Sequence, residues 1–166
     1  MTRTMSLAAL LLATPAAAQD AADELAVLRV PTEIERAVDR QAGDRARGHF
    51  ADEITVDFTS LAGGEPATIP ADALIEGWAA NLGPAKTSHH QRGHGLVTWA
   101  GPDRATVERA GYAWNRMEGN GDPLWEVWGD YTHELVRTED GWKVEAMTFE
   151  VTHQRGNDWV RDTPGS

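Results

Sequence analysis

The region from Trp125 to Val151 constrains the fold of this chain more than any other segment. It reads as two long strands, because β-favouring Trp, Val, Tyr, Thr and Phe residues recur along both halves. Between the halves, Thr138-Glu139-Asp140-Gly141 ends in the Asp-Gly pair that tight hairpin turns favour, since glycine readily adopts a positive φ. The sequence therefore predicts a long antiparallel hairpin whose aromatic residues form a wall of a core or of a pocket.

Helical patterns come mainly before this hairpin. Asp20–Arg29 has acidic residues at its start, and Pro31 opens a second stretch whose apolar face carries Ile34 and Val38. Further along, the sequence predicts a short helix over Asp44–Phe50, a strand over Ile54–Phe58, a loop over Leu61–Pro70, a helix over Ala71–Leu82, and strands over Lys86–Trp99 and Arg104–Trp114. This order predicts an α+β fold, in which a curved antiparallel sheet wraps on the N-terminal helices and forms a cone.

The first eighteen residues are typical of a secretory signal peptide. Arg3 precedes a short apolar run, and Thr14–Ala18 ends in the small residues that precede a cleavage site. We expect cleavage before Gln19, which makes the mature protein periplasmic or secreted. The expected organisation is a signal peptide over 1–18, a lead-in helix over 19–30, one domain over 31–157 and a flexible tail over 158–166.

Composition narrows the possible partners and cofactors. The formal net charge is −11 at pH 7, so the surface repels nucleic-acid phosphates and anionic membranes. No segment after the signal is long and apolar enough to span a bilayer. Cysteine is absent, which excludes thiol nucleophiles and thiolate metal sites. We expect no nucleic-acid partner, no membrane insertion and no metal or other cofactor.

Asp39 and His89 are the candidate catalytic residues. Asp39 ends an apolar helix face, and His89 lies in an early strand next to His90. A carboxylate beside a histidine can fix one tautomer and leave the other ring nitrogen free to accept a proton. Alternatively, Asp39 is a solvated residue at a helix end and His89 is structural. A metal site is disfavoured, because His90 and His94 lie about 13 Å apart at strand rise.

Seven tryptophans give a second, binding-related signal. On the predicted strand over 124–137, Trp125 and Tyr131 share one face and Trp128 lies on the other. Most tryptophans fit a core or a dimer contact, but some could line a cavity for a flat apolar ligand. The candidate substrate-binding residues are Tyr131, Trp78, Trp128, Trp114 and Phe58.

The chain resembles the SnoaL-like branch of the NTF2-like superfamily over about residues 34–157. The resemblance rests on Ala37-Val38-Asp39, Phe50–Phe58, Thr87-Ser88-His89-His90, Gly129-Asp130-Tyr131, Leu135–Trp142 and Arg155-Gly156-Asn157, in that order. It implies a cone-shaped α+β barrel, a hydrophobic small-molecule ligand and a possible homodimer. It also implies the scytalone dehydratase and dehydrochlorinase type of site, in which Asp39 orients His89.

The sequence departs from the family pattern at Ala42 and Gly93, where an Asp and an Asn are common. The resemblance as a whole, with Asp39 and His89 in place, leads us to expect a cofactor-independent lyase that acts on an apolar, aromatic or cyclic molecule. Tyr131 is a possible assistant to the leaving group. Two alternatives stay open. One is an exported binding protein without catalysis, and the other is an isomerase or cyclase that uses Asp57 as its base.

Overall fold

A computed structural model describes residues 21–165, so the predicted signal peptide lies outside the described residues. The first element, α1 (Ala21–Val38), is one continuous helix with Pro31 inside it, and the predicted break at Pro31 is wrong. Proline removes one hydrogen bond from a helix interior. Here Pro31 is buried together with Val27 and Ile34 on the face that packs on the sheet. The burial of this face offsets the lost hydrogen bond.

Four shorter helices follow. They are α2 (Gly43–Arg47), α3 (Thr59–Ala62), α4 (Ala71–Asn81) and α5 (Asp158–Asp162). The helices predicted before and after the first strand are confirmed as α2 and α4, although Phe50 begins a strand instead of ending α2. The predicted loop over Leu61–Pro70 also contains the end of α3 and a short strand, β2 (Ala67–Pro70).

The C-terminal segment is ordered, so the prediction of a loose tail is wrong. The Asn157 side chain caps α5 by accepting a hydrogen bond from the Trp159 amide, and Val160 is fully buried. Gly165 donates to the Asn81 carbonyl and accepts from the Ala85 amide, each at 2.9 Å. The end of the chain is thereby tied to the segment between α4 and the strand that follows it.

The sheet has seven strands and is mostly antiparallel. Its order is β2, β1 (Phe50–Asp57), β7 (Gly141–Gly156), β6 (Leu124–Thr138), β5 (Arg104–Arg116) and β3 (Thr87–Arg92), while β4 (Leu96–Trp99) also pairs with β5. Only β1 and β7 run parallel among the described strands. The predicted strand over Lys86–Trp99 is thus two strands. The break falls at Gly95, where a Cβ atom would lie 2.6 Å from the Leu28 side chain of α1.

The predicted hairpin is confirmed as β6 and β7, with Thr138 paired to Gly141 across the turn. Gly141 has a φ of 102°, as the Asp-Gly signal requires. The β6–β7 register shifts between Trp128 and Gly129. Such bulges increase the local bend and twist of a strand, and they allow the sheet to curve around the helices.

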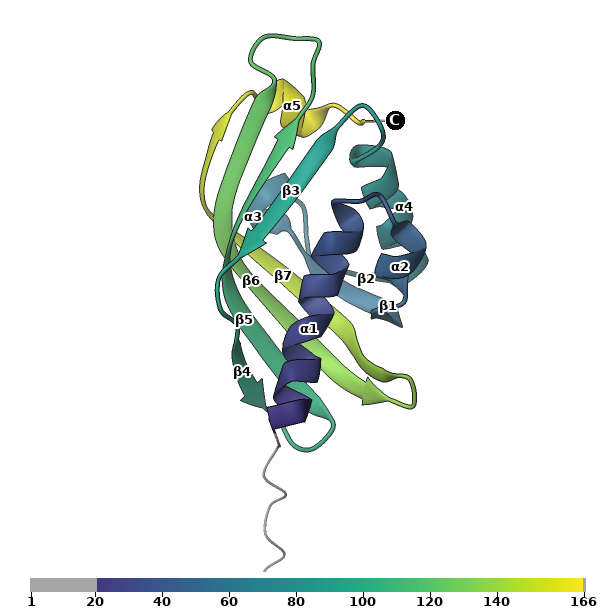
Figure 1. Cartoon of the computed structure of the whole chain (residues 1–166). Coiled ribbons are helices and arrows are strands. Elements are labelled where there is room, and N and C mark those ends of the chain that lie inside the picture. The colour runs from purple at the N-terminus through teal and green to yellow at the C-terminus, as the bar shows by residue number, and fades with distance from the viewer. Residues whose placement is uncertain (1–20, 166) are drawn as a thin grey trace, which may run out of the picture.

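The helices cover the concave side of the sheet, as Figure 1 shows, and α1 runs across the strands. The main core lies between these layers and includes Val27, Ile34, Ile54, Val107 and Leu135. The sheet is curved and not closed on itself. The predicted α+β cone is confirmed.

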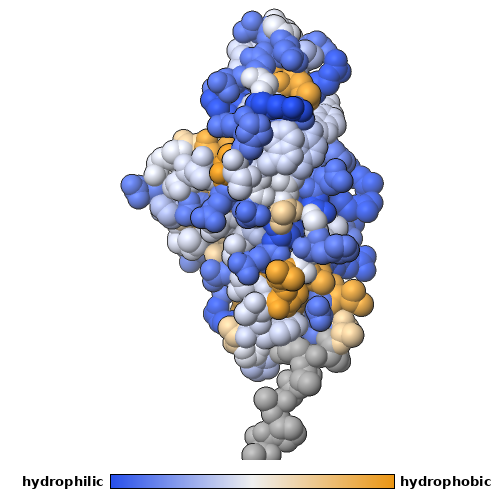
Figure 2. All heavy atoms as spheres, turned by 90° about the vertical axis from the view of Figure 1, so that its left-hand side faces the viewer, coloured by the Kyte–Doolittle hydropathy of each residue, from blue (hydrophilic) through white to orange (hydrophobic). Residues whose placement is uncertain are grey.

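The side of the sheet away from α2 and α4 is mainly hydrophilic. Figure 2 shows apolar residues on this side only as separate patches. Leu25 and Leu96 are the large hydrophobic residues that are most exposed among those described. No described helix meets the length and hydropathy needed to cross a membrane. The homodimer implied by the family resemblance stays a prediction.

Candidate functional site

A cavity of about 290 Å³ lies between α1, α4 and the concave face of the sheet. Most of its wall is apolar or aromatic, and it includes Phe58, Leu61, Trp78, Trp125, Tyr131 and Phe149. Its polar groups are fewer. Glu35 comes from α1, and His90 and Arg92 come from the sheet edge strand β3. An apolar cavity with a small polar set suits a small, largely hydrophobic ligand.

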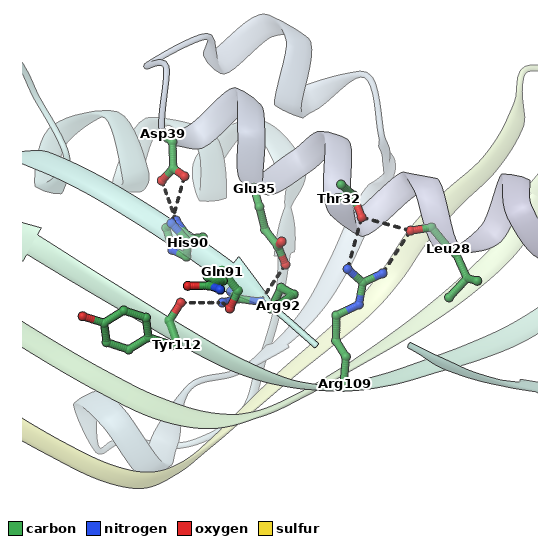
Figure 3. Close-up of polar contacts among 9 residues, drawn as sticks. All are labelled: Leu28, Thr32, Glu35, Asp39, His90, Gln91, Arg92, Arg109 and Tyr112. Atoms are coloured by element: carbon green, nitrogen blue, oxygen red, sulfur yellow. Dashed lines mark hydrogen bonds and ion pairs between the residues drawn. The ribbon is translucent and has the colours of Figure 1, made fainter. Parts of the chain in front are cut away.

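Asp39 and His90 form the tightest polar contact at this cavity (Figure 3). Oδ1 of Asp39 lies 2.6 Å from Nδ1 of His90, and Oδ2 accepts the His90 backbone N–H at 2.8 Å. The Ser88 hydroxyl donates to Oδ1 at 3.1 Å. Asp39 follows the last residue of α1, so the helix end presents its carboxylate directly to β3.

These contacts define the charge and tautomer of the pair. Burial pushes the pKa of Asp39 upward, but the hydrogen bonds from His90 and Ser88 outweigh burial and leave the pKa below its usual value. A charged Asp39 favours a proton on Nδ1 of His90. None of the hydrogen bonds of His90 within residues 21–165 uses Nε2. Nε2 is therefore the ring nitrogen able to accept a proton from a ligand.

His89, the predicted base, does not face the cavity. Its side chain is 52% exposed and packs against Trp114, with ring centroids 5.7 Å apart. Its Nδ1 lies 3.7 Å from Asp39, but His90 and not His89 lines the cavity. Neighbouring strand residues point to opposite faces, so the choice between two consecutive histidines depends on strand orientation. The structure therefore places His90, and not the predicted His89, at the cavity wall.

Glu35 and Arg92 form a second polar pair that the sequence reasoning missed. Glu35 Oε1 lies 2.8 Å from Arg92 Nε, and both side chains are largely buried. The Arg92 guanidinium also lies 3.8 Å above the centre of the Tyr131 ring. Burial raises the pKa of Glu35 despite the opposing charge of Arg92. The available signal was spacing, because Glu35 precedes Asp39 by four residues and Arg92 follows His90 by two.

Arg109 and His133 are two further buried polar residues near the cavity. Arg109 donates to the Leu28 carbonyl at 2.9 Å and to the Thr32 hydroxyl at 3.2 Å, which fastens α1 to β5. His133 lines the cavity and is 1% exposed. Burial, together with the nearby Arg109 and Arg92, lowers its pKa to about 3. His133 is therefore a neutral part of the wall at neutral pH.

Three of the five predicted substrate-binding residues line the cavity, namely Tyr131, Trp78 and Phe58. Trp114 and Trp128 do not. Trp114 contacts His89, and Trp128 packs between Tyr112 and His153 with ring centroids 4.9 and 5.3 Å away. Both tryptophans alternate with cavity residues along their strands, so they lie on the opposite face. Their predicted binding role is not supported by their positions.

Asp57, the base of the isomerase alternative, is also outside the cavity lining. Its Oδ1 accepts hydrogen bonds from the backbone N–H and hydroxyl of Thr59 at 3.1 and 2.7 Å. These bonds lower the pKa of Asp57. They connect the end of β1 to the first residue of α3. Among residues 21–165, no cluster of three or more His, Asp or Glu side chains could hold a metal ion.

Comparisons with known proteins agree with this architecture. A family model described as a SnoaL-like domain matches residues 19–148. A crystal structure of the Kfla4162 protein from Kribbella flavida is 27% identical, with a TM-score of 0.79 over 84% of this chain and 97% of that chain. A search of curated protein sequences finds no significant match.

Two further structures share the fold at lower identity. A candidate scytalone dehydratase from Novosphingobium aromaticivorans is 16% identical, with a TM-score of 0.72 over 82% of this chain and 88% of that one. A type 2 hexachlorocyclohexane dehydrochlorinase is 13% identical, with a TM-score of 0.62 over 89% and 94% of the two chains. At these identities the similarity shows the fold alone.

Proposed function

Because this chain belongs to the SnoaL-like domain family, we propose that it is a cofactor-independent lyase in which His90 is the general base and Asp39 orients it. The observation that carries this proposal is the 2.6 Å contact between Asp39 Oδ1 and His90 Nδ1 at the wall of an apolar cavity. The proposal keeps Asp39 from the sequence analysis and replaces His89 with His90.

In the proposed reaction, Nε2 of His90 removes a proton from a carbon atom of the bound substrate. Asp39 stabilises the imidazolium that forms, since its carboxylate already contacts Nδ1. The imidazolium then returns the proton to the departing group. A well-placed base of this kind contributes about 10²–10⁴-fold to the rate.

Two observations support elimination chemistry on a hydrophobic molecule. The names of two structural neighbours describe the loss of water and of hydrogen chloride. The cavity wall is mostly apolar, and Phe58, Trp78 and Tyr131 give it aromatic surfaces on which a ring can pack. We therefore propose an apolar, aromatic or cyclic substrate.

The proposed site can be tested with two compounds of suitable size. 1-Indanone reports proton removal through deuterium uptake at its α carbon in D₂O, followed by NMR. 3-Hydroxy-1-indanone reports elimination through the absorbance of the indenone produced. The unmodified protein should accelerate both reactions, and His90→Ala and Asp39→Asn should each remove most of the acceleration while circular dichroism stays unchanged.

Two results would overturn the proposal. Equal rates in the unmodified protein and in His90→Ala would exclude His90 as the base. Tight binding of both compounds without any acceleration would favour the alternative of a binding protein without catalysis.

We also propose that the protein is exported after removal of residues 1–18. N-terminal sequencing of the protein secreted by its native host, or recovered from its periplasm, should begin at Gln19. A chain that retains Met1 in the cytoplasm would contradict export.

A further inference from the structure

The polar groups of the cavity are arranged as two matched pairs along α1 and β3. On the helix, Glu35 and Asp39 are four residues apart, so they lie on one face about one turn apart. On the strand, His90 and Arg92 are two residues apart and share the inner face. Asp39 contacts His90 and Glu35 contacts Arg92 (Figure 3). Arg92 is thus held beside the base at a spacing of about 7 Å along the strand.

The local structure keeps Arg92 in this position. Its partner across the β3–β5 pairing is Gly111, where a Cβ atom would lie 2.8 Å from Nη1 of Arg92. The absence of a side chain at Gly111 leaves room for the guanidinium, which lies 3.8 Å from the centre of the Tyr131 ring. Nη1 donates to the carbonyls of Gln91 and Tyr112 at 3.4 and 3.3 Å. The hydrogen bonds that Arg92 donates to carbonyl groups among residues 21–165 come from Nη1, and its side chain lines the cavity, where a ligand can meet the guanidinium.

Groups that can carry charge of both signs surround the cavity. Two carboxyl groups, Glu35 and Asp39, lie near two guanidinium groups, Arg92 and Arg109. When His90 accepts a proton, this group of five side chains gains one positive charge. It then matches a substrate that has just gained one negative charge. A site that is complementary to the charge formed during reaction favours the transition state over the bound substrate.

We propose that Arg92 is a second catalytic residue, that it binds an acceptor oxygen of the substrate next to the carbon that His90 deprotonates, and that Glu35 is its positioning residue. This inference rests on the proposed function of His90. When Nε2 takes the proton, the C–H electron pair forms a carbon–carbon double bond and the carbonyl electron pair moves onto oxygen. The Arg92 N–H groups stabilise that oxyanion. On collapse the carbonyl re-forms, the electron pair of the enolate double bond forms a new double bond to the β carbon, and the C–O bond at that carbon breaks. The proton on His90 leaves with the hydroxyl group as water.

The two carboxyl groups beside the proposed site also favour one class of substrate. A neutral ring compound with a carbonyl oxygen adds no charge on binding. A carboxylate would bring a further negative charge close to Glu35 and Asp39 and across an acidic protein surface. The substrate is therefore a neutral, cyclic carbonyl compound instead of an organic acid.

Binding measurements test Arg92 without depending on catalysis. Isothermal titration calorimetry would compare 1-indanone, indane and indane-1-carboxylate, which share one bicyclic frame. The unmodified protein should bind 1-indanone at least about tenfold more tightly than indane, because a hydrogen bond to a charged group supplies that preference. Indane-1-carboxylate should bind more weakly than 1-indanone.

Variants separate the role of Arg92 from that of His90. The double variant Glu35→Gln/Arg92→Met removes both charges together, so that neither is left buried and unpaired. It should reduce the ketone preference to within about threefold while indane affinity is retained. Arg92→Lys should keep most of the preference. His90→Ala should keep the ketone preference and lose deuterium exchange.

An undiminished ketone preference in the double variant would overturn the role of Arg92, even if His90 proves to be the base. Tighter binding of the carboxylate than of the ketone would overturn the neutral substrate class. Loss of the ketone preference in the double variant, without exchange in the unmodified protein, would retain the Arg92 binding site and reject the proposed function of His90.

Discussion

The carboxylate of Asp39 holds His90 at two points, the ring Nδ1 at 2.6 Å and the backbone N–H at 2.8 Å. One side chain therefore sets both the tautomer of the imidazole and the position of its strand against the end of α1. Since β3 is the last strand of the sheet path, α1 provides the support that a further strand would otherwise give. The two contacts link helix docking to the orientation of the proposed base.

The two adjacent histidines give a matched comparison. His90→Asn should lower kcat/KM for deuterium exchange of 1-indanone by about 10²-fold or more, because it removes the proposed base. His89→Asn should keep the rate within about threefold, because His89 is half exposed and outside the cavity. A larger loss in His89→Asn than in His90→Asn would restore the original sequence prediction.

Gly111→Ala tests the placement of Arg92 without removing its charge. The new Cβ atom would meet the Arg92 guanidinium at 2.8 Å and should displace it from Tyr131. We expect about a tenfold loss of 1-indanone affinity by calorimetry, with indane affinity unchanged, since a charge-assisted hydrogen bond is lost. Gly77→Ala is the control, because nothing lies within 4 Å of a Cβ at this position on α4.

His133 should make folding stability depend on pH. Its pKa is about 3 in the folded protein and 6.5 in its ordinary state, so the folded chain binds fewer protons between these values. The contribution of His133 to the free energy of unfolding is therefore present above pH 6.5 and is lost as the pH falls toward 3. Between about pH 7.5 and about pH 5 this loss amounts to about 2 kcal/mol.

Urea unfolding at both pH values would measure this loss. His133→Leu removes the titrating group and should reduce the pH dependence by a similar amount. An identical pH dependence in both proteins would show that His133 is protonated as readily in the folded state as in the unfolded chain.

Val160→Ala tests whether the C-terminal helix contributes to stability. Val160 is fully buried in a hydrophobic cluster, and 0% of its surface is accessible to water. Removing two buried methyl groups should lower the free energy of unfolding by about 1–3 kcal/mol. An unchanged unfolding temperature would contradict the packing of α5 against the sheet.

Sequence periodicity predicted the parts of the fold that depend on local pattern. The β6–β7 hairpin follows from alternation and from Asp140-Gly141, and the helix α4 follows from its apolar face and its Gly-Pro stop. Asp39 was selected because it ends an apolar helix face, and its carboxylate contacts His90. The continuity of α1 through Pro31 was not predicted, because tertiary packing on the sheet outweighs the local cost of a proline.

The differences between the predicted and the observed cavity lining have another physical origin. Whether His89 or His90 faces inward depends on how β3 is oriented on β5, and the same alternation assigned Trp114 and Trp128 to a cavity that they do not line. The Glu35–Arg92 pair joins residues far apart in the chain, and each one alone looks like an ordinary surface charge. These features require the three-dimensional arrangement of α1 against the sheet edge.

The hydrogen bonds of Gly165 have a practical consequence for work with this protein. They tie the last described residue to Asn81 and Ala85, just before the strand that carries His90 and Arg92. An affinity tag fused after Ser166 would begin two residues beyond this buried glycine and would disturb the loop that leads into the proposed site. A removable tag placed before α1 would leave that connection intact and is the better choice for every measurement of activity.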